Sequence, residues 1–453
     1  MAEKKKVGMV SLGCPKNLVD SEVMMGLLAR QGYEITNDSS AADVLVVNTC
    51  GFIDSARQES VDTILEMAQL KETGKLKRLV VAGCLVERFR DELQREIPEI
   101  DALIGVNELK EIERAVEPNG RRKSLPIYSD GAAVPELYLY DETTPRLRAT
   151  APYTSYVKIA EGCDHTCTFC IIPKLRGAFR SRSPESILRE VELLAAQGVK
   201  EIVLISQDTT TYGSDLAMKE GLARLVDSIA DVKGVEWIRF LYCYPTAITD
   251  ELLRVMAERE NVCKYFDIPL QHASRRVLQR MRRGGARASY ERLIERIRNQ
   301  VPGVAVRTTF IVGFPGEREE DFEELVDFVR AVELDRVGVF TYSDEENSPA
   351  FELDEKVDAE TAKRREARLM KEQARISRRR NRELVGRQVK VLLEGRSKES
   401  DLLLEGRMES QAPEIDGSIL INDVPEGRDV RPGDFVTVEI TEAHEYDLIG
   451  RVV

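Results

Sequence analysis

Three cysteines on one short loop constrain this chain more than any other feature of its sequence. Cys163, Cys167 and Cys170, the central triad, form a CxxxCxxC pattern directly after the apolar segment 155–160. Three thiolates on one tight loop can bind three irons of a 4Fe–4S cluster and leave the fourth iron open. The alternatives are buried cysteines that cluster by coincidence, or a zinc site, which normally needs four ligands and would strain this loop if His165 completed it. The pattern therefore predicts a 4Fe–4S cluster with one open iron.

Three further cysteines lie far apart in the sequence but in equivalent positions. Cys14, Cys50 and Cys84, the N-terminal triad, are separated by 36 and 34 residues, and each ends an apolar segment. One strand-plus-helix unit takes roughly 30 residues, so these segments fit strands of a parallel sheet, whose carboxyl ends share one edge. Buried thiols that only pack are the alternative. The pattern favours a three-thiolate site, and we expect a second 4Fe–4S cluster with an open iron there.

The remaining cysteines and the composition narrow the class of protein. Cys243 and Cys263 lie near strand segments, where we expect them to pack. The N-terminus shows no pattern of an export signal and no apolar run reaches the ~18 residues of a membrane span, so we expect a cytoplasmic protein with reduced thiols. The net charge of −13 argues against a broad nucleic-acid-binding surface, which needs excess Lys and Arg.

The hydrophobic pattern predicts an α/β chain of three domains and a linker. Residues 5–120 alternate short apolar strands with helices, as in a doubly wound parallel sheet. Residues 121–148 show no periodicity and contain several prolines, which predicts an extended linker. Residues 149–382 contain six strand–helix units and predict a partial or full β/α barrel. Residues 384–453 contain five short strands between Pro and Gly turns and predict a small, closed, OB-like antiparallel β-barrel.

The predicted elements alternate between strand and helix through the first two of these domains. The strands expected there span 7–12, 44–48, 79–82, 155–160, 201–205, 235–242, 265–268, 304–312 and 338–341. The expected helices span 21–30, 55–70, 87–96, 185–197, 290–299, 319–332 and 359–383. The strands expected in the terminal barrel span 388–393, 402–404, 418–421, 434–440 and 448–453.

The central triad resembles the signature of the radical S-adenosylmethionine superfamily, CxxxCxΦC with an aromatic residue at Φ, here Phe169. The resemblance implies that S-adenosylmethionine binds the open iron through its methionyl amine and carboxylate. One electron then cleaves it to a 5′-deoxyadenosyl radical. Gln207, Gln271, Gly313 and Gly316 follow predicted barrel strands and are candidate contacts to S-adenosylmethionine. For each of them, a loop position without any ligand is the alternative.

The whole chain resembles the methylthiotransferase family, and its terminal barrel resembles a TRAM domain. That family has two main substrate classes, adenosine in tRNA and an aspartate in small-subunit ribosomal protein twelve. The segments 11–22, 48–56, 206–210 and 266–274 resemble the ribosomal-protein subfamily. The first segment reads Gly-Cys-Pro-Lys-Asn where the tRNA enzymes usually have Gly-Cys-Gln-Met-Asn. Ala178 is a variation that we expect to have no consequence.

The resemblance implies a division of work between the two triads. The central triad holds the cluster that generates the radical, and the N-terminal triad holds the cluster whose open iron binds an external sulfur. A first S-adenosylmethionine methylates that sulfur, and a second supplies the radical that removes hydrogen from the aspartate β-carbon, which then takes the methylthio group. A general base near neutral pH cannot usefully remove so weakly acidic a proton. We expect no catalytic residue beyond the six cysteines.

Three kinds of polar residue remain without a firm role. Arg176 and Arg180 follow the central triad, where arginines either steer a carboxylate or simply lie on the surface, and we predict no role for either. His272 is predicted to satisfy a buried hydrogen bond rather than to act as an acid or base. For His165 and His444 a role as an acid or base is predicted even less than for His272.

Charge helps to separate the two substrate classes. Residues 384–453 carry eight Lys and Arg against fifteen Asp and Glu, a net charge of −7. A barrel that binds tRNA should be basic, whereas an acidic barrel suits a basic ribosomal protein. The segment 363–382 carries ten Lys and Arg and two Asp and Glu, and either faces rRNA or pairs with acidic residues elsewhere.

We therefore expect ribosomal protein twelve as the substrate, either free or within the ribosome. The further partners that we expect are an electron donor such as flavodoxin or ferredoxin and a sulfur donor, with no membrane, and the chain is expected to be a monomer. One alternative is a tRNA adenosine methylthiotransferase with the same chemistry. Others are a non-catalytic iron–sulfur or zinc protein that binds RNA, and a radical enzyme whose N-terminal cluster only relays electrons.

Overall fold

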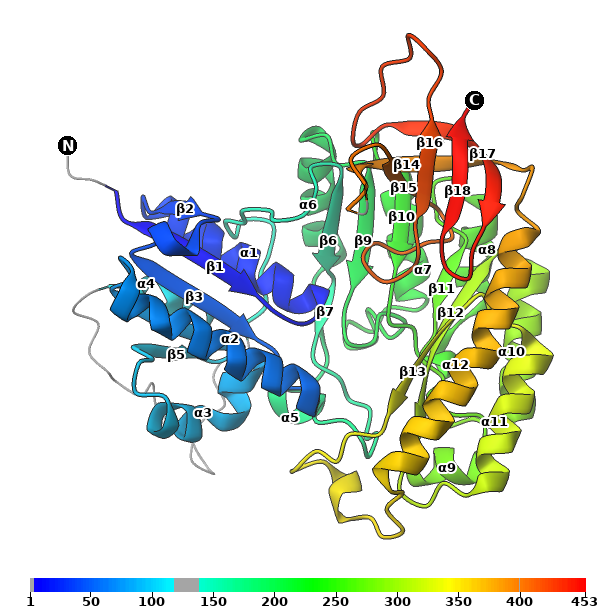
Figure 1. Ribbon diagram of the computed structural model, residues 1–453, viewed down its shortest axis with the longest axis horizontal. Coiled ribbons are helices and arrows are strands. Elements are labelled where there is room, and N and C mark those ends of the chain that lie inside the picture. Colours follow the sequence, from blue (N-terminus) through cyan, green and yellow to red (C-terminus); the bar gives the residue numbers. More distant parts are fainter. Residues whose placement is uncertain (1–3, 118–137, 399) are drawn as a thin grey trace.

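The computed structural model describes residues 4–117, 138–398 and 400–453. An N-terminal sheet, an open barrel of β/α units and a small closed β-barrel follow one another along the chain (Figure 1). The predicted α/β fold class is therefore confirmed. None of the helices in the described ranges is long and apolar enough to cross a membrane.

The N-terminal domain is a parallel sheet of five strands in the order β2-β1-β3-β4-β5. Its strands are β1 (Lys6–Ser11), β2 (Glu34–Thr36), β3 (Val44–Thr49), β4 (Arg78–Gly83) and β5 (Ala102–Ile104). Its helices are α1 (Pro15–Arg30), α2 (Asp54–Thr73), α3 (Cys84–Glu96) and α4 (Ile112–Ala115). The central strand β3 is buried along its whole length because α1 and α4 cover one face of the sheet and α2 and α3 the other. This arrangement is doubly wound, as predicted.

Two details of this domain differ from the expected elements. Helix α1 begins at Pro15 rather than at Ser21, because proline has the backbone angle of a first helical residue and needs no hydrogen-bond partner there. The strands β2 and β5 are not predicted by the hydrophobic pattern, since each has only three residues. Both extend the edges of the sheet without changing the order of its three central strands.

The predicted linker, residues 121–148, lies outside the described residues up to position 137. From residue 138 to the first barrel strand the chain forms no helix or strand and runs against α1. Gly26 in α1 permits this contact, because a Cβ atom at that position would collide with the carbonyl group of Pro145. Arg146 then pairs with Glu22 of α1 at 2.5 Å and with Glu190 at 2.8 Å.

The central domain is an open barrel of six parallel strands. They are β6 (Thr154–Lys158), β9 (Glu201–Ile205), β10 (Trp237–Phe240), β11 (Tyr265–Asp267), β12 (Ala305–Val312) and β13 (Arg336–Thr341). They pair as β10-β9-β6 and β11-β12-β13. Backbone hydrogen bonds from Cys243 to Asp267 and from Cys263 to Ile238, both 2.9 Å, connect β10 to the β11 segment. Both cysteines are buried, as predicted.

Helices cover the outside of this barrel. They are α6 (Pro184–Ala196), α7 (Gly221–Ala230), α8 (Asp250–Glu258), α9 (Arg275–Arg280), α10 (Arg287–Gln300) and α11 (Glu319–Val332). A short ribbon of β7 (Ala160–Glu161) and β8 (Arg180–Ser181) flanks the central triad, with α5 (Ile172–Arg176) between them. Single 3₁₀ turns occur at Ser39–Ala41, Leu109–Glu111, Pro245–Ala247 and Pro349–Glu352. Within the described residues β6 and β13 do not pair, so the barrel is partial rather than full.

The basic helix α12 (Ala359–Arg382) lies along β13 and α11 (Figure 1). Several of its cations pair with acidic residues of α11 and the segment after it. Arg365 lies 3.1 Å from Glu319, and Arg380 lies 2.7 Å from Asp335. Of the two alternatives left open for this helix, pairing with acidic residues elsewhere in the chain is thus realised for part of its surface.

The C-terminal domain is a closed barrel in the order β14-β15-β16-β18-β17. Its strands are β14 (Gln388–Arg396), β15 (Leu404–Met408), β16 (Ile419–Asp423), β17 (Phe435–Ala443) and β18 (Leu448–Val452). All pairs are antiparallel except β16 with β18. The strand expected at 402–404 is wrong, because Leu402 is 90% exposed in a loop and β15 begins only at Leu404.

A buried ion cluster joins the two barrels. Glu201 of β9 lies 2.6 Å from Arg407 of β15 and 3.3 Å from Arg239 of β10. All three side chains are almost completely buried. Burial opposes the charge on Glu201, but the positive charges of Arg407 and Arg239 outweigh it and lower its pKa to about 2. The carboxylate therefore stays ionised, and the ion cluster stabilises the contact above the ordinary carboxyl pKa of 4.5.

We predict that Glu201→Gln lowers the free energy of unfolding by about 3–5 kcal/mol at pH 7, because it leaves buried Arg239 without an ion-pair partner among the described residues and buried Arg407 with Glu394 alone. The matched control is Glu236→Gln, which removes an exposed ion pair with Lys390 between the same two domains. That change should cost less than about 1 kcal/mol. Urea unfolding of the two variants measures the difference. Acid stability gives a second readout, since the Glu201 contribution is lost as the pH falls from 4.5 towards 2. Equal costs for the two variants would contradict the prediction.

Candidate functional site

The N-terminal triad lies at the carboxyl edge of the sheet, where the strand order changes direction. Cys14 follows β1 and precedes α1, Cys50 follows β3, and Cys84 is the first residue of α3 after β4. Gly13 has φ +86°, and a Cβ atom there would lie 2.8 Å from the Cβ of Cys50. The crevice at this switch point is where open α/β sheets bind their ligands. The topology thus brings the three cysteine loops together, as expected.

Polar side chains fix these loops to one another. The Asn17 side-chain amide donates a hydrogen bond to the Thr49 carbonyl oxygen at 2.8 Å, and Asn48 donates to the Asn17 carbonyl oxygen at 2.8 Å. The Ser60 hydroxyl accepts from the Cys50 N–H at 3.1 Å and donates to its carbonyl oxygen at 2.9 Å. These bonds hold the loops in place without using the thiols, which remain free.

The central triad lies on the loop between β7 and α5, as the spacing predicts. The Cys163 N–H donates to the Gly177 carbonyl oxygen at 3.2 Å, and the Cys170 N–H donates to that of Cys167 at 3.1 Å. The Thr168 N–H donates to the Met281 carbonyl oxygen at 3.0 Å, which attaches the loop to the segment after α9. The loop is therefore held by its own backbone and by the barrel.

Burial makes most of these thiols poor acids. It raises the pKa of Cys84 and of Cys163 to about 11 and that of Cys170 to about 12, and it also raises the pKa of Cys50. Cys14 differs, because the charges of Lys16 and Arg176 outweigh the effect of burial and lower its pKa. Thiolates are the form that binds metal, so the four thiols with a raised pKa need a bound cationic centre to ionise near neutral pH.

One buried arginine contacts each triad. A guanidinium nitrogen of Arg176 lies 3.5 Å from the sulfur of Cys84, and one of Arg283 lies 3.6 Å from the sulfur of Cys167. Arg283 also stacks on the ring of Tyr244 at 4.4 Å, and Tyr244 stacks on His165 at 3.8 Å. Positive charge beside each triad suits a group of thiolates that carries net negative charge.

A cluster of four buried charges, the hub, connects the N-terminal domain to the barrel. Lys158 of β6 lies 2.5 Å from Asp20 of α1 and 2.6 Å from Glu161 of β7. Arg176 of α5 lies 3.1 Å from Asp20 and 3.0 Å from Glu161, and it donates to the Asn17 side chain at 2.6 Å. Burial opposes charge on Glu161, but Arg176 and Lys158 lower its pKa. The hub holds the N-terminal triad beside the loop of the central triad.

Each of the two candidate glutamines has an unsatisfied side-chain oxygen. Gln207 donates its amide N–H to Glu161 at 2.5 Å, while its side-chain oxygen is buried and has no hydrogen-bond partner among the described residues. Gln271 has φ +71°, which is uncommon outside glycine. Its side-chain oxygen is also buried, and no residue in the described part of the chain donates a hydrogen bond to it. Buried acceptors of this kind are costly unless a ligand or water satisfies them.

The two candidate glycines have a packing explanation. A Cβ atom at Gly313 would collide with Ala362 of α12, and one at Gly316 would collide with the guanidinium of Arg280. The Gly313 N–H also donates to the carboxylate of Glu317. The structure therefore places both glycines at the carboxyl end of β12, with close neighbours on the side that a Cβ would occupy.

Arg176 is not a surface arginine but a buried member of the hub, and its long-range partners leave no signal in the local sequence. Arg180 donates only to backbone oxygens, of Ala178 at 2.8 Å and of Arg176 at 3.5 Å. His272 is buried and accepts a hydrogen bond from the Ser274 N–H at 2.9 Å, as predicted. His165 lies 2.6 Å from Asp208. Sequence reasoning also missed Arg283, which belongs to no motif.

The donor set fits a cluster better than a single ion. In the described part of the chain, no three His, Cys, Asp or Glu side chains converge tightly enough to hold one metal ion. A 4Fe–4S cluster places each thiolate on a different iron, so its ligands need not converge on one point. Two sets of three free thiols, each beside a buried arginine, match that requirement.

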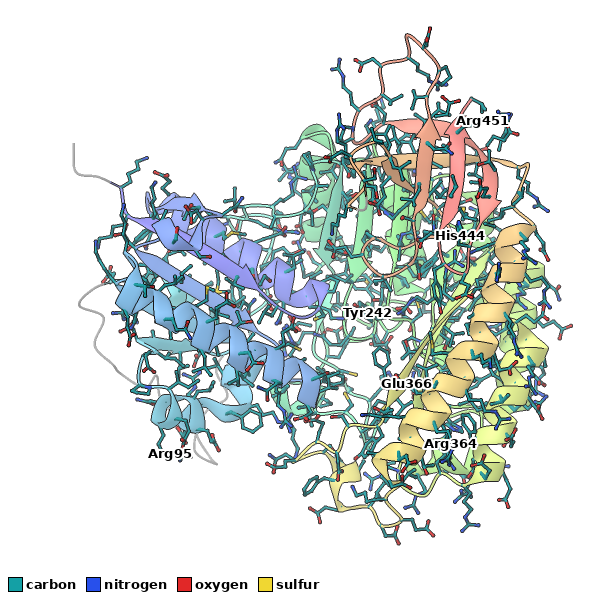
Figure 2. All side chains as sticks on the ribbon, in the orientation of Figure 1. Arg95, Tyr242, Arg364, Glu366, His444 and Arg451 are labelled. Atoms are coloured by element: carbon teal, nitrogen blue, oxygen red, sulfur yellow. The ribbon has the colours of Figure 1, made fainter. Side chains whose placement is uncertain are left out.

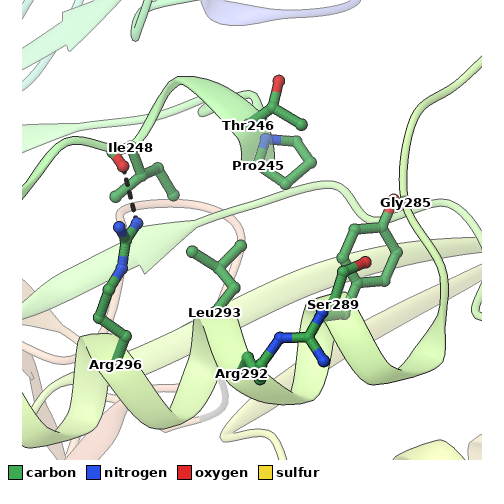
Figure 3. A pocket seen from close by; sticks show the side chains of 9 residues that line it. Pro245, Thr246, Ile248, Gly285, Ser289, Arg292, Leu293 and Arg296 are labelled. Carbon is green, nitrogen blue, oxygen red and sulfur yellow. Dashed lines mark hydrogen bonds between the residues drawn. The ribbon is translucent and has the colours of Figure 1, made fainter.

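A surface cavity of about 330 Å³ is lined by residues of the segment after β10 and of α10. Figure 3 shows Pro245, Leu293 and Arg296 around it, with Arg296 donating to the Ile248 carbonyl oxygen at 2.8 Å. None of the six cysteines lines this cavity. We therefore place the candidate site at the two triads and not in this cavity.

Three family descriptions match successive parts of the chain. They are the uncharacterized protein family UPF0004 over residues 6–105, the radical SAM superfamily over 157–329 and the TRAM domain over 385–453.

Among characterised relatives, the ribosomal protein uS12 methylthiotransferase RimO of Koribacter versatilis (strain Ellin345) is 51% identical and covers 99% of this chain and 96% of its own. The RimO protein of Solibacter usitatus (strain Ellin6076) is 55% identical and covers 99% and 95%. Among solved structures, the radical S-adenosylmethionine methyltransferase TsrM of Kitasatospora setae matches with a TM-score of 0.53 at 16% identity, over 75% of each chain, which shows a similar fold.

We predict that Arg176→Met weakens the contact between the N-terminal domain and the barrel by about 3–5 kcal/mol, because Asp20 and Glu161 then share one buried cation. Faster hydrogen–deuterium exchange in α1 and α5 would report this loss. The matched control is Arg180→Met, four residues further along, which removes only hydrogen bonds to backbone oxygens and should change exchange far less. Equal exchange in the two variants would contradict the role of the hub.

Proposed function

Because the chain belongs to the family of ribosomal protein uS12 methylthiotransferases, RimO, we propose that it transfers a methylthio group to the β-carbon of an aspartate in ribosomal protein uS12. The observation that carries this proposal is the hub, through which Arg176 contacts Cys84 of the N-terminal triad and Glu161 beside the central triad. Two cysteine triads held beside one domain contact suit a reaction that needs two metal centres acting on one residue.

We propose that Cys14, Cys50 and Cys84 hold one 4Fe–4S cluster and that Cys163, Cys167 and Cys170 hold the other. When bound, these clusters and S-adenosylmethionine supply the radical and the methylthio group. The chain buries Cys84 and Cys167, leaves the other four cysteines half-buried, and places a cation beside each triad. Gln207 and Gln271 offer unsatisfied side-chain oxygens to S-adenosylmethionine, and Gly313 and Gly316 remain weaker candidates for that contact.

The acidic C-terminal barrel supports a protein substrate over tRNA. Its net charge of −7 suits a basic ribosomal protein by charge complementarity and disfavours phosphate. We further propose that the enzyme works in the cytoplasm as a monomer, with flavodoxin or ferredoxin as electron donor and a separate sulfur donor. The domain boundaries at 5–120, 121–148, 149–382 and 384–453 stay a prediction.

We predict that the anaerobically reconstituted enzyme contains about eight iron atoms, and that Cys50→Ala contains about four. Cys50→Ala should still form 5′-deoxyadenosine from S-adenosylmethionine but transfer no sulfur, whereas Cys163→Ala should lose both activities. Cys243→Ala is the matched control, since Cys243 is a buried cysteine outside both triads and its loss should leave iron content and activity unchanged. About four irons in the unmodified enzyme would overturn the two-cluster assignment.

We predict that deleting the gene removes a methylthio group from ribosomal protein uS12 and leaves tRNA unchanged. Mass spectrometry of the ribosomal protein and of digested tRNA from the same strain measures both. The loss of methylthioadenosine with an unchanged ribosomal protein would instead identify a tRNA enzyme. Loss of neither modification, together with no 5′-deoxyadenosine formation, would identify a non-catalytic protein.

A further inference from the structure

Lys16 is exceptional among the buried cations of the described chain. Eight Lys and Arg residues are buried, and seven of them make an ion pair or a hydrogen bond. These seven are Lys158, Arg176, Arg182, Arg239, Arg283, Arg365 and Arg407. Lys16 has neither among the described residues, although it is only 8% exposed. A buried ammonium whose N–H donors have no hydrogen-bond acceptor is costly, so its place favours a ligand that supplies one.

Lys16 reaches from the N-terminal domain towards the barrel. It lies in the first turn of α1, two residues after Cys14, and its ammonium nitrogen lies 3.1 Å from the centre of the Tyr242 ring. Tyr242 follows β10, and Figure 2 shows it in the middle of the molecule, between the N-terminal sheet and the barrel. The ring holds the ammonium group in place by a cation–π contact and leaves its N–H donors available.

The carboxylates closest to Lys16 already have other partners. Asp267 accepts from the Tyr242 N–H at 3.0 Å and pairs with Arg307 at 2.7 Å. Glu161 is shared by Lys158 and Arg176 in the hub. No Asp or Glu in the described residues forms an ion pair with Lys16. The one anion beside it in this part of the chain is the thiolate of Cys14, which the proposed function assigns to a cluster, so the ammonium N–H donors remain open to a carboxylate from a bound molecule.

The backbone at Tyr242 gives an independent indication of a functional position. Tyr242 has φ +64°, a conformation that bulky residues rarely adopt and that costs free energy. Its N–H is nevertheless fixed by Asp267. Such strain persists where the surrounding structure enforces it, and it clusters at ligand-binding sites.

The position of Lys16 between the two triads indicates which anion it binds. Lys16 neighbours Cys14 of the N-terminal triad, and Tyr244, two residues after Tyr242, stacks with Arg283, which contacts Cys167 of the central triad. We propose that Lys16 binds the side-chain carboxylate of the aspartate that the enzyme modifies, an inference that rests on the proposed function. The carboxylate is one bond from the β-carbon, so a cation that fixes it also positions the reacting C–H bond.

The test compares two peptides of the uS12 target loop, one with the native aspartate and one with asparagine in its place. Binding of each is measured to the cluster-loaded enzyme and to Lys16→Met, which removes the charge at similar length. Lys16→Gln is a second neutral variant, and Lys16→Arg retains the charge. Lys219→Met, an exposed lysine far from both triads in the sequence, is the matched control. Iron content and 5′-deoxyadenosine formation without peptide are measured for each variant.

We expect both neutral variants to bind the aspartate peptide about 10- to 100-fold more weakly and the asparagine peptide within about twofold of the unmodified enzyme. Binding is compared at the iron content measured for each variant. Formation of 5′-deoxyadenosine without peptide should not change, because it needs the central triad alone, and Lys16→Arg and Lys219→Met should keep the preference for aspartate. Equal losses for both peptides would overturn the proposal, as would weaker binding of S-adenosylmethionine with unchanged peptide binding, because the anion would then be the cosubstrate carboxylate. If the unmodified enzyme neither binds nor modifies the aspartate peptide, the proposed function itself fails.

Discussion

Two buried carboxylates and two buried cations hold the two halves of the site together. Asp20 comes from the N-terminal domain, while Lys158, Glu161 and Arg176 come from the barrel, so neither domain balances these charges alone. Buried charges tolerate little displacement, because separating a partner leaves an uncompensated charge. The hub therefore fixes the distance and the orientation between the two cysteine loops. The position of Lys16 beside Tyr242 depends on the same domain contact.

Much of the fold follows from local sequence patterns. Buried strands such as β3 and β4 are visible because each contains an apolar run of four residues. The start of α1 is missed because its first turn, at Pro15 and Lys16, carries few apolar residues. The terminal strand at 402–404 is misplaced because an apolar run does not reveal that Leu402 points into solvent. The barrel would close only if β6 paired with β13. These strands are remote in sequence, so no local pattern predicts whether they pair.

The candidate site is predictable only in part, for a related reason. The cysteines could be grouped because the carboxyl ends of strands in a parallel sheet share an edge. The regular spacing of the cysteines in the sequence therefore predicts that they lie close together in space. Arg176 and Arg283 act through partners more than 90 residues away, and no local pattern encodes such pairs. Lys16 sits inside a recognisable segment, yet its significance lies in the absence of an ion-pair partner among the described residues, which only three-dimensional contacts reveal.

The ion cluster around Glu201 has a consequence for the modularity of the chain. Arg407 belongs to the terminal barrel and pairs there with Glu394, but its second carboxylate partner, Glu201, lies in β9 of the central barrel. Tyr265 of β11 likewise donates to Asp416 of the terminal barrel at 2.7 Å. Trimming the enzyme to a minimal catalytic core would strip these polar groups of their partners. The terminal barrel is thus not an independent module. If it were transferred to another protein, that protein would have to supply residues equivalent to Glu201 and Arg239.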